Sequence, residues 1–163
     1  MTNIKRIAYL GIGIALYVVL GLAMNIPILA GTHLQTDLGY IAFGCYLYCF
    51  GWPALIVGVL GCMLESLLTS GWIPAGWMVG QLVIGLLCGF VYKKSNKKLI
   101  HILIAVFAVF IGVGLIKTGI ECALYSIPFA IKFPKNCVAF VADAIPMILG
   151  LFIGYKVKRY IKE

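Results

Sequence analysis

Charged residues are scarce in this sequence. Asp, Glu, Lys and Arg make up 11% of its 163 residues, whereas soluble domains carry about 25%. Acidic residues are the rarest of these, with five against thirteen Lys and Arg. Together with 63% hydrophobic residues and a mean hydropathy of +1.09, this scarcity excludes a soluble globular domain. It predicts an all-α integral membrane protein.

Motifs for catalysis and for metal binding are also missing. No GxxxxGK[ST] loop is present, so we do not expect the chain to hydrolyse nucleotides by itself. The two histidines, His33 and His101, are expected on opposite sides of the membrane, and no nucleophile has a recognisable base nearby. Cys45 and Cys49 stand four residues apart, without a His or an acid at ligand spacing. The sequence therefore predicts neither an enzyme nor a metal or other cofactor.

Apolar runs dominate what is present. A membrane-spanning helix needs about 20 residues, and the first run has no small-residue cleavage site before a polar domain, so it is expected to remain as a span. We predict a compact bundle of six transmembrane helices in one integral-membrane domain, 1–163, with spans near 7–29, 38–52, 53–69, 74–92, 99–125 and 136–156. The alternative is a five-span topology in which the second and third runs form one hairpin bent at FGWP, Phe50 to Pro53.

Basic residues cluster at the ends of these runs, and they predict the orientation, because cytoplasmic loops are enriched in Lys and Arg. Only Lys132 and Lys135 fall in loops on the other side. The cytoplasmic set would be Lys5, Arg6, Lys93, Lys94, Lys97, Lys98, Lys156, Lys158, Arg159 and Lys162. Both termini are thus predicted to be cytoplasmic in a cell-membrane protein, and the net charge of +8 is explained by contact with anionic lipid. Nucleic-acid binding is not expected, because these residues do not lie on a soluble domain with interleaved aromatic residues.

Polar residues inside the apolar runs are the candidates for function. In GLIKTGIECALY, Lys117 and Glu121 lie four residues apart, on one helix face. With the predicted topology, the other polar residues lie at a similar depth, towards the outside: Glu65, Trp77, Gln81, Asn136 and Asp143. Because ionisable side chains avoid lipid, we predict one polar cavity open to the exterior. The alternative is that these residues only hold helices together.

The loop LAGTHLQTDLGY adds His33, Gln35 and Asp37 as candidate ligand contacts or as part of a lid. The acids Glu65, Glu121 and Asp143 outnumber Lys117, so mutual pairing would leave negative charge. This excess predicts a substrate with an amine or another cationic group. Trp77 is the candidate for stacking on an aromatic ligand.

The first span carries small residues at helical spacing: Ala8, Gly11 and Ala15. Gly11 and Ala15 form a small-xxx-small pair that permits close helix approach. This face is predicted either to pack inside the bundle or to receive a partner protein.

Phrases along the whole chain carry a family resemblance. They are AYLGIGIALYVVLG, TDLGYIAF, FGWPALIVGVLG, GWIPAGWMVGQLVIGLLCGF and FPKNCVAFVADAIPMILGLFIG. With these, the sequence resembles the substrate-binding S-components of energy-coupling-factor transporters for vitamins. The resemblance implies a six-helix bundle that binds a micronutrient from outside. It also implies docking, through Ala8, Gly11 and Ala15, onto a transmembrane coupling protein driven by two cytoplasmic ATPases, and toppling in the membrane to deliver the cargo.

The cargo suggested by the acids, Trp77, Gln81 and Asn136 is a flat nitrogen heterocycle with a donor edge or an amine. Family cargo of this kind includes a queuosine precursor of the deazapurine class, thiamine or its pyrimidine, and a pyridoxine-like ring. The deazapurine is favoured, because a guanine edge offers paired donors to a carboxylate. Two other functions stay open: a structural or assembly subunit of a larger membrane complex, and a proton-coupled carrier with Asp143 or Glu121 as the relay.

Overall fold

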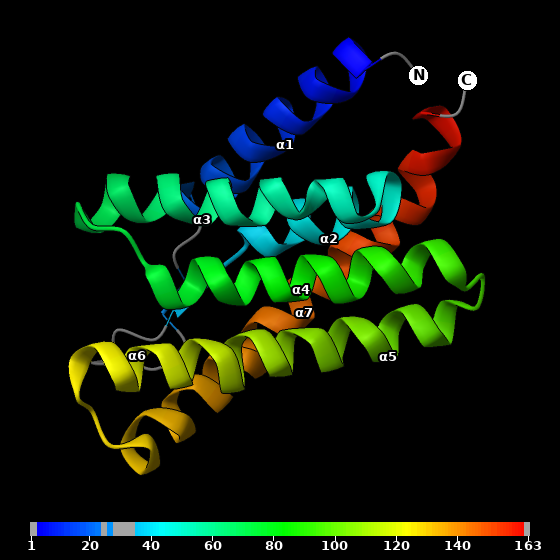
Figure 1. The fold of residues 1–163 in the computed structure, drawn as a ribbon. Helices are drawn as coiled ribbons and strands as arrows, with labels where there is room; N and C mark the ends of the chain where they lie inside the picture. Colours follow the sequence, from blue (N-terminus) through cyan, green and yellow to red (C-terminus); the bar gives the residue numbers. More distant parts are fainter. Residues whose placement is uncertain (1–2, 24–25, 28–34, 162–163) are drawn as a thin grey trace.

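The computed structural model describes residues 3–23, 26–27 and 35–161, and nearly all of them are helical (Figure 1). The helices are α1 (Asn3–Ala23), α2 (Gly39–Phe50), η1 (Trp52–Ala54), α3 (Leu55–Ser70), α4 (Ala75–Lys94), α5 (Lys98–Val109), η2 (Phe110–Lys117), α6 (Thr118–Tyr125) and α7 (Phe129–Ile161). The predicted all-α class is confirmed. A two-residue ladder is added to it, in which β1 (Ile26–Pro27) pairs antiparallel with β2 (Gln35–Thr36).

Among the described residues, five helices are long and apolar enough to cross a membrane, and a sixth apolar helix is short. The consecutive helices α5, η2 and α6 together form one of these five, over Lys98–Tyr125. Helix α2 has 12 residues, about 18 Å at 1.5 Å per residue, and is too short for a hydrocarbon core of about 30 Å. The predicted break at FGWP is present, because Gly51 has a φ of 70° between α2 and η1. The six predicted segments thus correspond to six helices of the bundle. Of these, α2 is long enough to cross only part of a hydrocarbon core.

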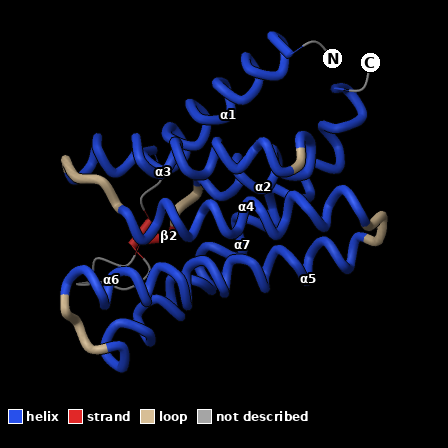
Figure 2. The backbone as a smooth tube through the Cα atoms, viewed as in Figure 1, coloured by secondary structure: helices blue, strands red, loops and turns tan. Residues whose placement is uncertain are grey.

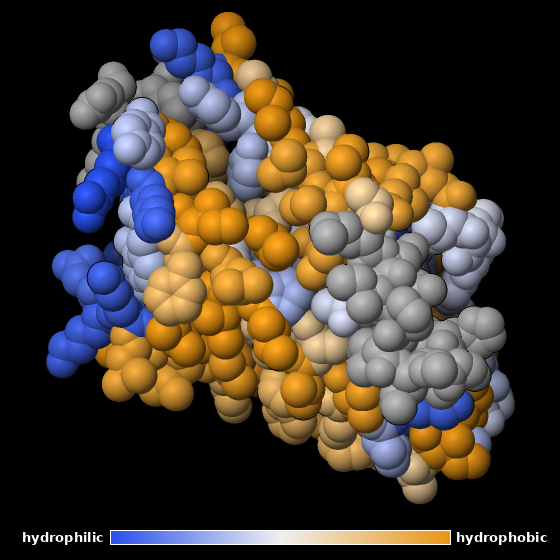
Figure 3. All heavy atoms as spheres, turned by 180° about the vertical axis from the view of Figure 1, so that it is seen from behind, coloured by the Kyte–Doolittle hydropathy of each residue, from blue (hydrophilic) through white to orange (hydrophobic). Residues whose placement is uncertain are grey.

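Both termini lie at one end of the bundle, called here the terminal end, together with the turn between α4 and α5 (Figure 1). The α3–α4 and α6–α7 connections lie at the opposite end, as the tube in Figure 2 shows. Hydrophilic residues gather at the terminal end, and hydrophobic residues cover the surface between the two ends (Figure 3). The predicted basic residues therefore share one end, apart from Lys162, which lies outside the described residues. That this end faces the cytoplasm stays a prediction.

The core forms where α2 packs against α7. Tyr40, Phe43 and Leu47 of α2 are fully buried, and a Cβ atom built on Gly150 of α7 would collide with the backbone of Ile41. This glycine therefore lets the two helix backbones approach closely. As a result α2, the shortest of the six, lies inside the bundle and its first residues reach the polar side chains described below.

Helix α7 begins at Phe129, seven residues before the predicted sixth span. The prediction placed Lys132 and Lys135 in a loop, because they interrupt the apolar run. The structure corrects this boundary, since the helix continues through both lysines and through Pro134 and Pro146. Its 33 residues extend about 50 Å, so the first turns reach past the apolar run and contact α6.

Candidate functional site

A hydrogen-bonded network joins three helices near the beginning of α2. The Tyr17 hydroxyl of α1 donates to Oδ2 of Asp37, and Nε2 of Gln81 in α4 donates to the Tyr17 oxygen at 3.1 Å. The backbone N–H of Asp37 donates to Oδ1 of Asp143 in α7 at 3.3 Å. We call Tyr17, Asp37, Gln81 and Asp143 the tyrosine–aspartate network. It connects α1 directly to α4, and it connects α1 to α7 through Asp37, two residues before the start of α2.

Asp37 is held in place by its own backbone turn, because the N–H of Gly39 donates to its Oδ1 at 2.8 Å. Gly39 packs against the ring of Tyr17, where a Cβ atom would lie 2.5 Å from the nearest ring carbon. Burial raises the pKa of the Asp37 carboxyl to about 6, although the bonds from Tyr17 and Gly39 and the charge of Lys117 act in the opposite direction. The carboxyl therefore changes its protonation near neutral pH.

Three buried polar atoms beside this network have no hydrogen-bond partner among the described residues. They are Oη of Tyr40, Oε1 of Gln81 and Oδ2 of Asp143, and all three residues have 0% exposure. Buried polar groups are hydrogen-bonded in the large majority of cases, and an unpaired one is costly. The amide and carboxylate oxygens of Gln81 and Asp143 therefore have hydrogen-bonding capacity that the described residues leave largely unused, and Tyr40 lies beside Gln81.

An aromatic and cationic wall adjoins these atoms. Nζ of Lys117 lies 3.5 Å from the centroid of the Trp77 ring, and this ring lies 6.4 Å from that of Tyr40. Lys117 is 6% exposed and lies within electrostatic reach of Asp143 and Glu121. Trp77 therefore adjoins both the buried lysine and the ring of Tyr40.

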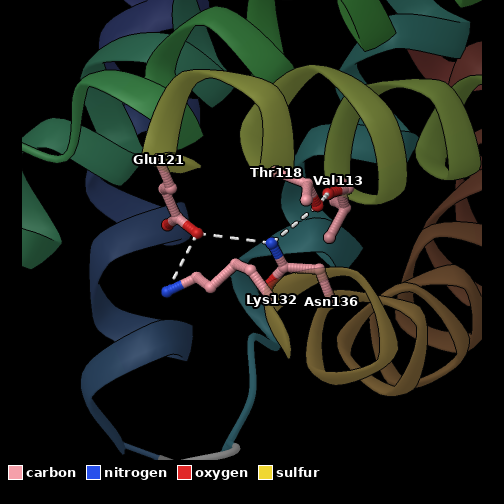
Figure 4. Close-up of polar contacts among 5 residues, drawn as sticks. All are labelled: Val113, Thr118, Glu121, Lys132 and Asn136. Carbon is pink, nitrogen blue, oxygen red and sulfur yellow. Dashed lines mark hydrogen bonds and ion pairs between the residues drawn. The ribbon is translucent and has the colours of Figure 1, made fainter. Parts of the chain in front are cut away.

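A second polar group ties α6 to the first turns of α7 (Figure 4). Oε2 of Glu121 pairs with Nζ of Lys132 at 3.1 Å and accepts from Nδ2 of Asn136 at 3.3 Å. Nδ2 of Asn136 also donates to Oγ1 of Thr118 at 2.8 Å, which donates to the carbonyl of Val113 at 3.4 Å. The ion-pair partner of Glu121 is thus Lys132, and not Lys117 as the helix spacing suggested.

A π-helix, η2, separates these two groups. It interrupts the long helix over Lys98–Tyr125 just before Thr118, and π-helical turns are frequent at functional sites. Gly80 of α4 and Gly112 of η2 meet there, because a Cβ atom on Gly80 would lie 2.7 Å from the Gly112 carbonyl oxygen. The close approach brings Lys117 to Trp77 on the neighbouring helix.

The ten predicted site residues are distributed unevenly. Asp37, Gln81 and Asp143 come together in the tyrosine–aspartate network, Trp77 and Lys117 adjoin it, and Glu121 and Asn136 form the second group. Glu65 lies further along α3, where its carboxyl packs against Gly21 of α1. His33 lies outside the described residues. Gln35 belongs to β2, and its side chain is not among those described.

The sequence did not indicate four residues of these groups: Tyr17, Tyr40, Thr118 and Lys132. Tyr17 and Tyr40 lie in apolar runs, where a tyrosine ring ordinarily fills the core. A buried tyrosine hydroxyl nevertheless needs a partner, so a tyrosine deep in a predicted span was the available signal. Lys132 could not be assigned to Glu121, because the sequence placed it in a loop.

A separate groove of about 740 Å³ runs along the outer side of α7. Thr36 and Leu38 border it, and its floor is apolar, with Val138, Val141 and Ile145. None of the ten predicted residues lines it. The groove therefore lies apart from the polar groups.

The small residues of α1 face away from the bundle. Ala8, Gly11 and Ala15 are exposed, and a Cβ atom on Gly11 would meet nothing within 4 Å. Of the two predicted roles for this face, packing inside the bundle is wrong. A surface that can receive another protein remains.

Comparison with known proteins identifies the family. The model of the family described as "ECF-type riboflavin transporter, S component" matches residues 1–161. The chain belongs to this family. Similar bacterial proteins are each named UPF0397 protein. The one from Enterococcus faecalis is 26% identical, over 93% of this chain and 88% of its own length. The one from Streptococcus agalactiae serotype Ia is 25% identical, over 96% and 93%, and the one from Lactococcus lactis subsp. cremoris NZ9000 is 29% identical, over 91% and 86%.

Membership of the S-component family decides the general function. The protein is a multi-pass membrane subunit that binds a small-molecule substrate for uptake, and it is not an enzyme. S-components of energy-coupling-factor transporters work with a membrane coupling protein and with ATPases. The resemblance noted from the sequence is therefore confirmed.

Proposed function

We propose that this S-component, with 1–163 as one substrate-binding membrane domain, binds a flat nitrogen heterocycle between the tyrosine–aspartate network and the Trp77–Lys117 pair. The observation that carries the proposal is the set of three buried, unpartnered atoms on Tyr40, Gln81 and Asp143. A ligand at this position would stack on Trp77 and satisfy these atoms. Glu121 and Asn136 border the same region through Lys117, whose side chain and that of Glu121 both pack on Gly76.

The chemistry of the unpaired atoms favours a ligand with two donors. Oε1 of Gln81 and Oδ2 of Asp143 both accept, and the Tyr40 hydroxyl can donate to a ring carbonyl. A guanine-like edge supplies paired N–H donors beside a carbonyl oxygen, and a carboxylate accepts paired donors well. These features favour a deazapurine of the queuosine-precursor class over thiamine-like and pyridoxine-like rings.

Riboflavin is the second candidate, since it is named in the description of the matching family. Its ring system is flat and would stack on Trp77. The imide edge of riboflavin carries one N–H donor between two carbonyl acceptors, so it would satisfy only one of the two acceptor atoms. The number of donors thus separates the two candidates.

Delivery of the cargo is proposed to use the exposed α1 face of Ala8, Gly11 and Ala15 as the docking surface. Its occupant would be the coupling protein, driven by two cytoplasmic ATPases, and the S-component would topple to release its substrate. A face of small residues supports this role, because it lets a partner helix approach closely. His33, Gln35 and Asp37 would form the lid above the site, and Glu65 would lie at its margin.

The first experiment is mass spectrometry of the small molecule that stays with the chain purified alone in mild detergent. Its binding is then titrated by tryptophan fluorescence, against a panel with deazapurines, riboflavin, thiamine and pyridoxine. A near-stoichiometric heterocycle is expected. Absence of any ligand and of quenching across the panel would contradict the proposal and favour an assembly subunit. Uptake that persists without an ATPase partner would favour a proton-coupled carrier.

Variants on one helix localise the site. Asp143→Asn keeps the shape of the side chain but replaces an acceptor by a donor, so it is expected to weaken binding by about 10- to 100-fold, as for a charge-assisted hydrogen bond of about 1.5–3 kcal/mol. Ile145→Ala is the matched control, because Ile145 lies on α7 with 59% exposure. Equal affinities of the two variants would place the ligand elsewhere.

A further inference from the structure

The terminal end of the bundle contains a hollow that is lined by basic and aromatic side chains. It has a volume of about 250 Å³ and lies where the end of α2 and the start of η1 meet the ends of α1, α4 and α7. Arg6, Lys93 and Lys158 line it together with the aromatic residues Tyr48, Tyr92 and Trp52. None of the described carboxylates lines this hollow. The site is therefore cationic without a described acid to neutralise it.

Arg6 and Lys93, from α1 and α4, are the two cations of the hollow that could bind an anion. Nη2 of Arg6 donates to the Phe50 carbonyl at 3.3 Å, which leaves further N–H donors on a guanidinium that has five. Lys93 is exposed at the end of α4. Lys158 is already engaged, since its Nζ donates to the Tyr48 carbonyl at 3.1 Å and lies 4.3 Å from the Tyr48 ring centroid. The backbone carbonyls that hold Arg6 and Lys158 carry no net charge. The hollow therefore keeps its positive potential.

A buried donor at the same hollow independently points to a ligand. Tyr92 lines the hollow and is 5% exposed. Its Oη has no oxygen or nitrogen partner among the described residues, and its neighbour is the Cys88 thiol, which is a weak hydrogen-bonding group. A phenolic hydroxyl in this position can donate to an anionic oxygen. Two cations and one hydroxyl donor together fit a phosphate group.

A second, apolar hollow adjoins the first and shares Trp52 and Lys93 with it. It has a volume of about 460 Å³, and Gly89, Phe90 and Lys94 complete its lining. Phe90 and Trp52 are 73% and 55% exposed on the surface. An anionic head with an apolar tail fits both hollows, because Trp52, Gly89 and Phe90 line the second one and Lys93 and Lys94 add positive charge to it.

We infer that the two hollows form one binding site for an anionic phospholipid. The phosphate lies between Arg6, Lys93 and Tyr92, and the acyl chain lies along Trp52 and Phe90. Charge complementarity selects this occupant, and a tryptophan at the border between the two hollows has the position that tryptophan prefers at a membrane–water interface. The site lies at the end opposite to the proposed substrate site, so it does not depend on the identity of the cargo.

Native mass spectrometry of the purified chain with added lipid tests this site. Phosphatidylglycerol is expected to bind with one tight equivalent, and phosphatidylcholine is expected to bind more weakly. Arg6→Gln with Lys93→Gln should weaken phosphatidylglycerol binding by about 30-fold, at about fivefold for each cation. Lys97→Gln with Arg159→Gln is the matched control, because it removes the same charge from exposed residues outside the hollow.

Tyr92→Phe supplies a variant that preserves the ring. It should weaken phosphatidylglycerol binding by about five- to tenfold, as for one hydrogen bond. The melting temperature without lipid should change little, because the neighbour of the removed hydroxyl is the weakly hydrogen-bonding Cys88 thiol. Equal losses in the control pair, equal binding of the two lipids, or unchanged affinity in the Arg6/Lys93 variant would overturn the inference. Binding of glycerol phosphate as tight as that of the lipid would also overturn it, since the tail would then contribute nothing.

Discussion

Lys117 lies with its Nζ atom 3.5 Å from the centroid of the Trp77 ring. The lysine comes from η2 and the tryptophan from α4, and the tryptophan ring lies 6.4 Å from that of Tyr40. A cation over a ring face is held by the negative potential of the π-system. The pair orients the indole beside the polar atoms that are proposed to receive the substrate.

Replacing Trp77 by Ala should reduce substrate affinity, because an aromatic ring stacked on a heterocycle contributes about 1–3 kcal/mol. The expected loss is about 5- to 150-fold, measured by calorimetry with the compound found in the purified protein. Trp72→Ala is the control, since Trp72 is 46% exposed and stacks edge-on with Tyr125. Equal affinity losses in the two variants would reject Trp77 as the stacking residue.

The stability of the protein should depend on the protonation of Asp37. The pKa of this carboxyl is about 6 in the folded state because of burial, against about 3.9 in an unfolded chain. The folded state therefore binds the proton more tightly, and the contribution of Asp37 to stability is complete below about pH 4 and is lost as the pH rises through about 6.

Thermal unfolding in detergent from pH 4 to pH 7.5 measures this effect. Asp37→Asn should flatten the part of the stability profile that falls between about pH 4 and 6. Glu121→Gln is the comparison, because it removes another largely buried acid that pairs with Lys132 outside the tyrosine–aspartate network. A profile for Asp37→Asn with the same slope as the wild type would contradict the assignment.

Glu121 and Lys132 should be energetically coupled. Their side chains are only 9% and 26% exposed, so removing one partner leaves a poorly solvated charge. A double-mutant cycle with Glu121→Gln and Lys132→Met is expected to give a coupling of about 0.5–3 kcal/mol in denaturant unfolding. Lys135→Met, on an exposed residue of the same helix, should show none. Additive effects of Glu121→Gln and Lys132→Met would mean that the contact contributes nothing.

The close approach of α4 and η2 depends on Gly80. In Gly80→Ala the new Cβ atom would lie 2.7 Å from the Gly112 carbonyl oxygen, and a backbone atom cannot rotate away. We expect a destabilisation of about 1–3 kcal/mol and a weaker Trp77–Lys117 contact. Gly11→Ala is the control, since it meets nothing within 4 Å and should stabilise the helix by about 0.5–1 kcal/mol. Equal stabilities would show that α4 can shift without cost.

Docking onto the coupling protein should depend on the small residues of α1. Gly11→Leu is expected to leave substrate affinity unchanged and to reduce co-purification with the coupling protein and its ATPases, because the side chain keeps a partner helix at a distance. Leu86→Ala, which changes a 43% exposed residue of α4, is the comparison. Unchanged assembly of the Gly11→Leu variant would exclude this face as the docking surface.

The sequence predicted the architecture well because architecture follows from solvent preference. Runs of apolar residues near 20 positions long mark helices that cross a bilayer, and the Lys and Arg residues that flank them share one end of the structure. The sequence also selected Trp77, Gln81, Lys117 and Asp143, since polar side chains are too costly to place in lipid, and it selected Asp37 as part of a polar loop between two apolar runs. These choices need only the composition of each segment.

Only the tertiary structure decided which polar residues are partners. Helix spacing suggested Glu121 with Lys117, but the start of α7 at Phe129 brings Lys132 to Glu121 instead, and η2 places Lys117 against Trp77. Tyr17 and Tyr40 joined the site although each is consistent with an ordinary core position. The physical reason is that the burial of a side chain in a membrane depends on that residue and its solvent alone. A hydrogen bond or ion pair depends also on the register of two helices. In this protein, close glycine contacts and a π-helical segment set that register.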